Sequence, residues 1–87
     1  MDTVAAIATP PGIGAIGIIR VTGPRARSVL RAVVPGLPAD LAPRLATAGW
    51  ARDPASGARI DRVLAIAFDA GSSYTGEEAA EIHAHAG

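Results

Sequence analysis

Short apolar stretches, separated by prolines, glycines and polar residues, run along the whole 87-residue chain. Residues 3–9, TVAAIAT, end at two prolines, which cannot donate hydrogen bonds to a strand ladder. Residues 16–22, IGIIRVT, are rich in β-branched side chains. Both stretches predict strands, and the glycines between them predict a turn.

A helical spacing of apolar residues follows the Gly23-Pro24 pair. One stripe at i, i+3, i+4 and i+7 contains Ala26, Val29, Leu30 and Val33. Pro24 suits the first helical position, with Thr22 or Gly23 as the cap, and Pro35-Gly36 ends the pattern. We therefore predict one amphipathic helix in this region.

The second half of the chain predicts a hairpin. Residues 44–52 and 59–69 are strand-like, and residues 53–57, DPASG, form a good turn sequence between them. Residues 63–68, VLAIAF, are continuously apolar, which predicts a strand covered on both faces.

The last segment, residues 77–87, supports two interpretations. Its alanines and glutamates favour a helix, and Thr75-x-x-Glu78 matches a capping box. With a period of two, polar side chains gather on one face and apolar side chains on the other. The polar face would hold Glu81, His83 and His85, opposite Ala80, Ile82 and Ala84.

Composition narrows the function classes. The net charge is zero, so the sequence gives no support to a strongly basic nucleic-acid surface. All eight basic residues are arginines, and aromatic residues make up only 3% of the chain. The absence of cysteine excludes disulfides and thiolate chemistry. No apolar run reaches the ~18–20 residues of a membrane span, and the N-terminus lacks the basic region of a signal peptide.

Three glycines have the spacing of a dinucleotide-binding loop, Gly12-x-Gly14-x-x-Gly17. In such a loop the glycines lead into a helix, whereas here they lead into a predicted strand. The acidic residue expected ~20 positions later is also missing, since Asp40 is the next acid after Asp2. The glycines therefore predict a tight turn or a close backbone approach rather than NAD or FAD binding.

Arg20 and the two histidines stand out chemically. Arg20 is the only charge between residues 3 and 21, and a period of two places it beside Ile16 and Ile18, like a polar anchor in an apolar wall. His83 and His85 could face one metal, but Glu81 is the only further ligand nearby, so we predict no metal site.

Three stretches together resemble the N-terminal domain of the tRNA modification GTPase family MnmE, also called TrmE. They are DTVAAIATPPGIGAIGIIRVTG at 2–23, IDRVLAIAF at 60–68 and SYTGEEAAEIHAHAG at 73–87, so the resemblance covers essentially the whole chain. It implies an α+β tetrahydrofolate-binding fold of mainly antiparallel strands with one or two helices. It also implies that the last segment is a strand.

The resemblance implies that residues 1–87 are a folate-binding and dimerisation domain, incomplete at its C-terminal end. The family's helical and GTPase domains are then absent from this chain. GTP, Mg and K would bind in that GTPase domain, because no phosphate-loop motif and no lysine occur here.

The implied activity is modification of a tRNA wobble uridine, with a reduced folate of the 5-formyltetrahydrofolate type as one-carbon donor. The implied partners are a second copy of the chain, the flavoprotein MnmG and tRNA. We expect a cytoplasmic protein with no membrane partner.

The resemblance places folate contacts at Glu81 and Arg20. A carboxylate offers two acceptors to the adjacent N3–H and 2-amino group of a pterin. Arg20 could bind the pterin carbonyl, the formyl oxygen or the glutamate tail. Gly12, Gly14 and His83 are the expected pocket lining.

Three residues depart from the family pattern, namely Ile13, Ala15 and Ala86. The first two weaken any role for side chains of the glycine loop in ligand binding. The alternative function is a pure dimerisation or partner-docking module without ligand, and a metal-dependent hydrolase using His83 and His85 is a third.

Overall fold

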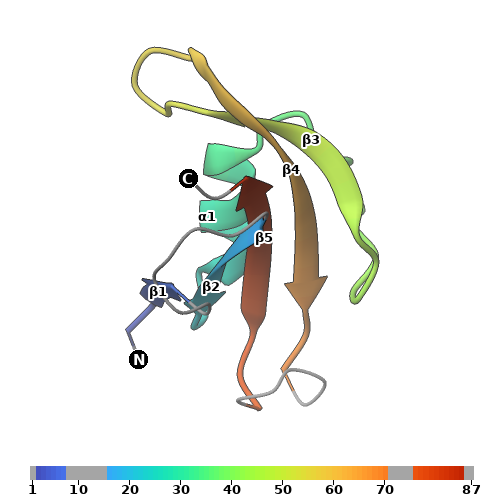
Figure 1. Ribbon diagram of the computed structural model, residues 1–87. Coiled ribbons are helices and arrows are strands. Elements are labelled where there is room, and N and C mark those ends of the chain that lie inside the picture. The colour runs from blue at the N-terminus through green and yellow to red at the C-terminus, as the bar shows by residue number, and fades with distance from the viewer. Residues whose placement is uncertain (1, 8–15, 71–75, 86–87) are drawn as a thin grey trace.

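The computed structural model describes residues 2–7, 16–70 and 76–85, which form one antiparallel sheet backed by one helix (Figure 1). The sheet has the strand order β1-β2-β5-β4-β3, and every neighbouring pair is antiparallel. This architecture agrees with the predicted α+β class. The elements in chain order are β1 (Val4–Ile7), β2 (Ile16–Thr22), α1 (Ala26–Val33), β3 (Thr47–Arg52), β4 (Arg59–Phe68) and β5 (Ala79–His85).

The last segment of the chain is the central strand β5, as the family resemblance implied. It pairs with β2 on one side and with β4 on the other, so its backbone is hydrogen-bonded along both edges. Its alternate residues Ala80 and Ile82 are buried under the helix. Pairing on both edges and burial of one face outweigh the helix propensity of its alanines and glutamates.

The core lies between α1 and one face of the sheet. The predicted stripe of α1 is confirmed, because Ala26 and Leu30 are fully buried and Val29 and Val33 pack against the core. The facing strand positions are mostly alanines and valines, which let the helix lie close to the sheet. These positions are Val21, Ala51, Val63, Ala65, Ala67, Ala80 and Ile82.

The start of α1 differs from the prediction. The helix begins at Ala26 rather than Pro24, and its N-cap Arg25 makes no side-chain capping hydrogen bond. The backbone N–H of Arg25 instead donates to the hydroxyl of Thr3, at 3.1 Å. Gly23 precedes this turn with φ +132°, and its N–H donates to the carbonyl of Glu78 at 2.8 Å. Residues 23 and 25 thus contact the segments just before β1 and β5, and α1 begins two residues later than predicted.

Strand β4 is covered on one face only, so the prediction of two covered faces is wrong. Val63, Ala65 and Ala67 are buried against the helix, whereas Leu64 on the opposite face is 44% exposed. The other two side chains of the run on that face, Ile66 and Phe68, are half-buried. An apolar run therefore does not require a second covering layer, because a sheet face without one can still hold apolar side chains.

Two strand boundaries also shift, and the hairpin turn is confirmed. Strand β3 begins at Thr47 rather than at Arg44, because Arg44 has φ 65° and cannot continue a strand. Strand β1 covers Val4–Ile7, and residues 8 and 9 lie outside the described ranges. The side chain of Asp53 accepts the N–H groups of Ala55 and Ser56, which closes the predicted turn.

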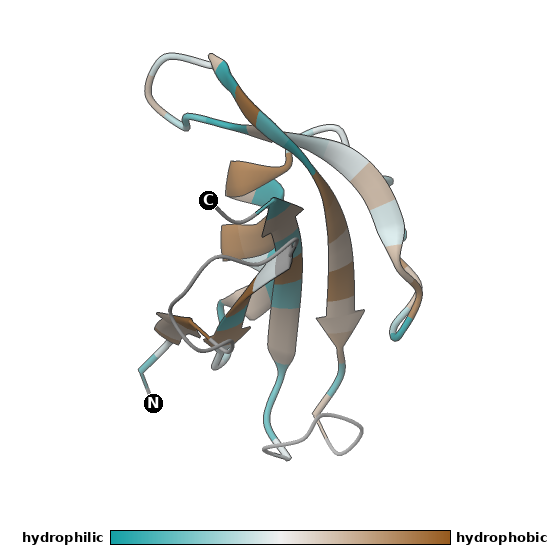
Figure 2. Ribbon diagram, viewed as in Figure 1, coloured by the Kyte–Doolittle hydropathy of each residue, from teal (hydrophilic) through white to brown (hydrophobic). Residues whose placement is uncertain are grey.

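The sheet therefore has two different faces. The face against α1 is apolar, and we call the opposite one the open face. Figure 2 shows hydrophilic and hydrophobic bands alternating along β5, as expected for a strand with unlike faces. Within the described ranges, the helix is too short to cross a membrane.

Candidate functional site

Three polar side chains form a continuous line of hydrogen bonds across the open face. Arg20 on β2 is the register partner of Glu81 on β5, so their side chains meet directly. Both Nε and Nη2 of Arg20 donate to Oε2 of Glu81, at 3.0 and 2.7 Å. On the other side, Nε2 of His83 lies 2.9 Å from Oε1 of Glu81. We call these three residues the Arg20–Glu81–His83 line.

The carboxylate of Glu81 is ionised within this line. Partial burial is the largest influence and raises its pKa, but the hydrogen bonds from His83 and Arg20, with the charge of Arg20, outweigh burial and leave the pKa below its ordinary value. Because an ionised carboxylate only accepts hydrogen bonds, Nε2 of His83 carries the shared proton. Glu81 thus presents a negatively charged carboxylate, and hydrogen bonds hold both of its oxygens in place.

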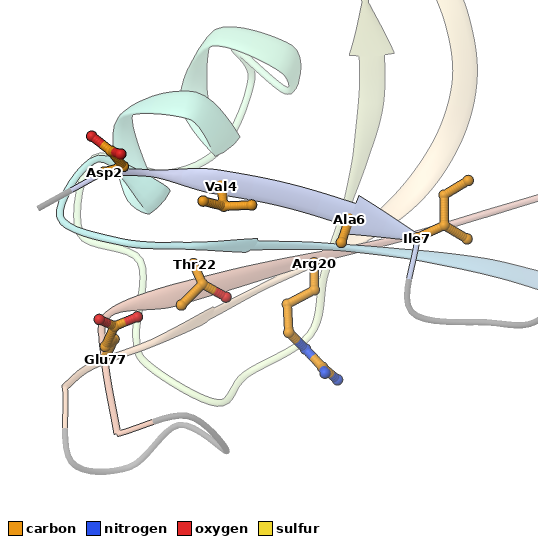
Figure 3. A pocket seen from close by; sticks show the side chains of 7 residues that line it. All are labelled: Asp2, Val4, Ala6, Ile7, Arg20, Thr22 and Glu77. Carbon is orange, nitrogen blue, oxygen red and sulfur yellow. The ribbon is translucent and has the colours of Figure 1, made fainter.

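A hollow of about 400 Å³ adjoins one end of this line, and we call it the β1 hollow. It is lined by Asp2, Val4, Ala6, Ile7, Arg20, Thr22 and Glu77. In Figure 3 the carboxylates of Asp2 and Glu77 lie at one end, beyond Thr22, and the guanidinium of Arg20 lies towards the other. The hollow combines apolar walls with a few charged groups, as small-molecule sites commonly do.

A second hollow, of about 180 Å³, adjoins the opposite end of the line, and we call it the β4 hollow. It is lined by Ala48, Arg62, Val63, Leu64, His83, Ala84 and His85. Arg20 lines the first hollow and His83 lines the second, while Glu81 bonds to both residues. The Arg20–Glu81–His83 line therefore connects two hollows on the same sheet face.

Comparison with known proteins identifies the family. The family described as "GTP-binding protein TrmE N-terminus" matches residues 3–87. The "tRNA modification GTPase MnmE" of Ralstonia nicotianae is 50% identical over 84 residues, which cover 97% of this chain and 17% of that protein. Those of Parvibaculum lavamentivorans and Thermotoga petrophila are 45% and 38% identical over 87 residues, covering all of this chain and 19% of each relative.

The chain belongs to the TrmE N-terminal family. It spans less than a fifth of the length of these relatives. The resemblance found from the sequence motifs is thereby confirmed at the level of the family.

In this TrmE N-terminal chain, the predicted pair Arg20 and Glu81 is brought into direct contact although 61 residues separate them. His83 joins the pair from the next position on the same face of β5, as the period of two predicted. Gly12 and Gly14 lie outside the described residues, so their predicted role stays a prediction.

The dinucleotide-loop alternative is excluded by the element that follows the glycines. Residues Ile16–Thr22 form β2, not a helix, and β2 pairs with β1 across the predicted turn. Gly17 is the register partner of Ala84, which packs against the helix-side core, and is therefore on the face away from Arg20.

The two histidines have separate partners. His83 contacts Glu81, whereas Nδ1 of His85 lies 2.9 Å from Oδ1 of Asp61 on β4. The backbone N–H of His85 also donates to Asp61, which lowers the pKa of that carboxyl together with the side-chain bond. Within residues 2–7, 16–70 and 76–85, no three potential metal ligands gather at one point.

Sequence reasoning missed several residues that line the hollows. Thr22 follows Arg20 by two residues on β2, so the period of two could have placed it on the open face. Arg62 and Leu64 are likewise two residues apart on β4, and both line the β4 hollow. Asp2 and Glu77 carried no signal, because they reach the site through the folding of distant segments.

Proposed function

We propose that this chain binds a reduced folate of the 5-formyltetrahydrofolate type, as the one-carbon donor within a tRNA wobble-uridine modification GTPase. The observation that carries the proposal is the Arg20–Glu81–His83 line between two hollows. Membership of the TrmE N-terminal family supports it, since the relatives are named tRNA modification GTPases.

The chemistry of Glu81 suits a pterin ring. Its pKa lies below the ordinary value, so it is a carboxylate near neutral pH. The N3–H and 2-amino group of a pterin present two donors side by side, which a carboxylate can accept as a bidentate pair. The hydrogen bond from His83 to Oε1 holds the plane of the carboxylate and leaves that oxygen further acceptor capacity.

Arg20 has to change partner when such a ring binds. Oε2 of Glu81 accepts two hydrogen bonds from Arg20, which occupy the acceptor sites that the ring would need. We expect the ring donors to displace Arg20 from Oε2. The guanidinium then turns to an acceptor oxygen of the ligand, such as the pterin carbonyl or the formyl oxygen.

The remaining functions belong to the intact protein. GTP hydrolysis, with Mg and K, would take place outside these 87 residues, which contain no phosphate-loop motif. A homodimer formed through this domain, association with MnmG and action on tRNA complete the proposal, and we place the protein in the cytoplasm.

Isothermal titration of the intact protein with 5-formyltetrahydrofolate tests folate binding. Glu81→Ala should weaken binding by roughly 2–4 kcal/mol, since it removes a charged partner from a partly buried site. Glu78→Ala is the matched control, because Glu78 lines neither the β1 hollow nor the β4 hollow. Its Oε1 instead lies 3.9 Å from Nε of Arg27 on α1. Equal affinity of wild type and Glu81→Ala would refute the assignment of Glu81.

A second candidate is a partner-docking module without ligand. Strand β1 favours it, because all four residues are exposed and Val4 and Ile7 are 60% and 76% accessible. An apolar strand at the edge of a sheet is a template for pairing with another chain. A protein that forms dimers but takes up no folate in the titration would favour this function over the first.

A further inference from the structure

The two hollows differ in charge. The β1 hollow is lined by the two carboxylates of Asp2 and Glu77 and by one cation, Arg20. The β4 hollow is lined by one arginine and two histidines, and by no carboxylate. Asp61 lies nearby, but its side chain is engaged by His85 and does not line the hollow. An elongated ligand with unlike ends would therefore have one favoured direction across this face.

We propose that the β4 hollow is a second subsite for the same ligand, in which Arg62 binds the carboxylate tail of the folate while the pterin ring lies at the β1 hollow. This inference rests on the proposed folate binding and adds the direction of the ligand and the residue that anchors its tail. The donor-rich ring would face Asp2, Glu77 and Glu81. The glutamate carboxylates would face Arg62.

The ligand has to be extended to reach both subsites. Ile66 is the register partner of Glu81, and Arg62 lies four residues away on the same face of β4, so it is displaced from the level of Glu81 by ~14 Å along the strand. The β1 hollow lies beyond Glu81 on the side of β2 and β1, which adds to this distance. Between the levels of Glu81 and Arg62 lie His83 and its register partner Leu64, which is 44% exposed. The aryl ring that links pterin and glutamate in a folate would pack on Leu64 across this interval.

The side chain of Arg62 is positioned by an aromatic ring. Its guanidinium carbon lies 5.8 Å from the ring centroid of Trp50, the register partner of Arg62 on β3. A cation held against an aromatic face loses less freedom when it binds a carboxylate. Arg59 also lies over this ring, at 4.6 Å, but does not line the β4 hollow. Arg59 is therefore the matched control for Arg62.

Titration of the intact protein with two ligands tests the proposal. The ligands are 5-formyltetrahydrofolate and 6-methyltetrahydropterin, which has the ring but no tail. Arg62→Gln should weaken folate binding roughly three- to tenfold, because the new ion pair is partly exposed to solvent. It should leave the affinity for the tail-less pterin unchanged, and Arg59→Gln should leave both affinities unchanged.

The outcomes separate this inference from the proposed function. Wild-type protein that binds neither ligand refutes folate binding itself. Folate binding that is unchanged in Arg62→Gln, or weakened equally by Arg62→Gln and Arg59→Gln, overturns the tail subsite alone. If Arg62→Gln does not fold, the wild-type protein alone tests the tail subsite. Equal dissociation constants for 5-formyltetrahydrofolate and the tail-less pterin would then exclude a tail anchor.

Discussion

The two faces of the sheet are built from the same strands but have opposite properties. On β5, Ala80 and Ile82 are buried against α1, while Glu81 and His83, which alternate with them, bond to each other on the open face. On β2, Val21 belongs to the core and its neighbour Arg20 belongs to the Arg20–Glu81–His83 line. Alternation along single strands thus separates packing from chemistry, residue by residue.

This separation has an energetic consequence. The helix face contains no buried polar side chain among the described residues, so its stability depends on apolar burial. The open face holds its charges in a partly exposed line, where ion pairs contribute little to folding. Substitutions on the face against α1 should therefore change mainly the free energy of unfolding, and substitutions on the open face should change mainly ligand affinity.

Leu30→Ala should give the largest effect on stability and none on ligand affinity. Leu30 is fully buried between α1 and the sheet, so its truncation leaves a cavity and should cost about 3 kcal/mol. Hydrogen exchange of the α1 amides in the intact protein measures the local opening energy, with the exposed Ser28→Ala as control. If Leu30→Ala lowered the local opening free energy by less than Ser28→Ala does, α1 would not form the core.

Gly23→Ala should destabilise the turn between β2 and α1 by about 2 kcal/mol, through its positive φ and a steric clash. A Cβ at Gly23 would lie 2.7 Å from the carbonyl oxygen of Asp2 and from Cα of Thr3, both of which belong to the backbone. Gly36→Ala is the control, because nothing lies within 4 Å of its added Cβ. Equal melting temperatures for the two variants would contradict this packing of the N-terminal segment.

Lowering the pH should reduce the free energy of unfolding through Glu81, by less than either substitution above. The pKa of Glu81 is lower in the folded chain than its ordinary value, so its contribution to stability is present above that value and is lost as the pH falls through the folded pKa. Unfolding of Glu81→Gln should therefore depend less on pH than unfolding of wild type below about pH 4.3. Identical pH profiles between pH 3 and 7 would contradict the ion pair.

The sequence predicted the helix face better than the open face. The stripe of α1 follows from local periodicity, because burial against one neighbour imposes the period directly. Strands β2 and β4 follow from short apolar stretches rich in residues that favour strands. The strand state of β5 did not follow from propensity, since it depends on pairing with β2 and β4. The family resemblance, rather than the residues alone, selected it.

The geometry of the site was only partly predictable. The resemblance singled out Arg20 and Glu81, but their direct contact depends on the register of two strands that are distant in the chain. Arg62 joins the second hollow because β4 pairs with β5, which no local pattern encodes. Long-range register is thus the information that sequence periodicity lacks.

A double-mutant cycle on folate affinity tests the central claim that Arg20 and Glu81 act as one ligand-binding unit. Dissociation constants for 5-formyltetrahydrofolate would be measured for wild type, Arg20→Gln, Glu81→Gln and the double variant of the intact protein. We predict that the two losses are non-additive by at least about 1 kcal/mol, because the residues contact each other in the free chain and, in the proposed complex, exchange partners on binding. Strictly additive losses, or no loss in either single variant, would contradict the account.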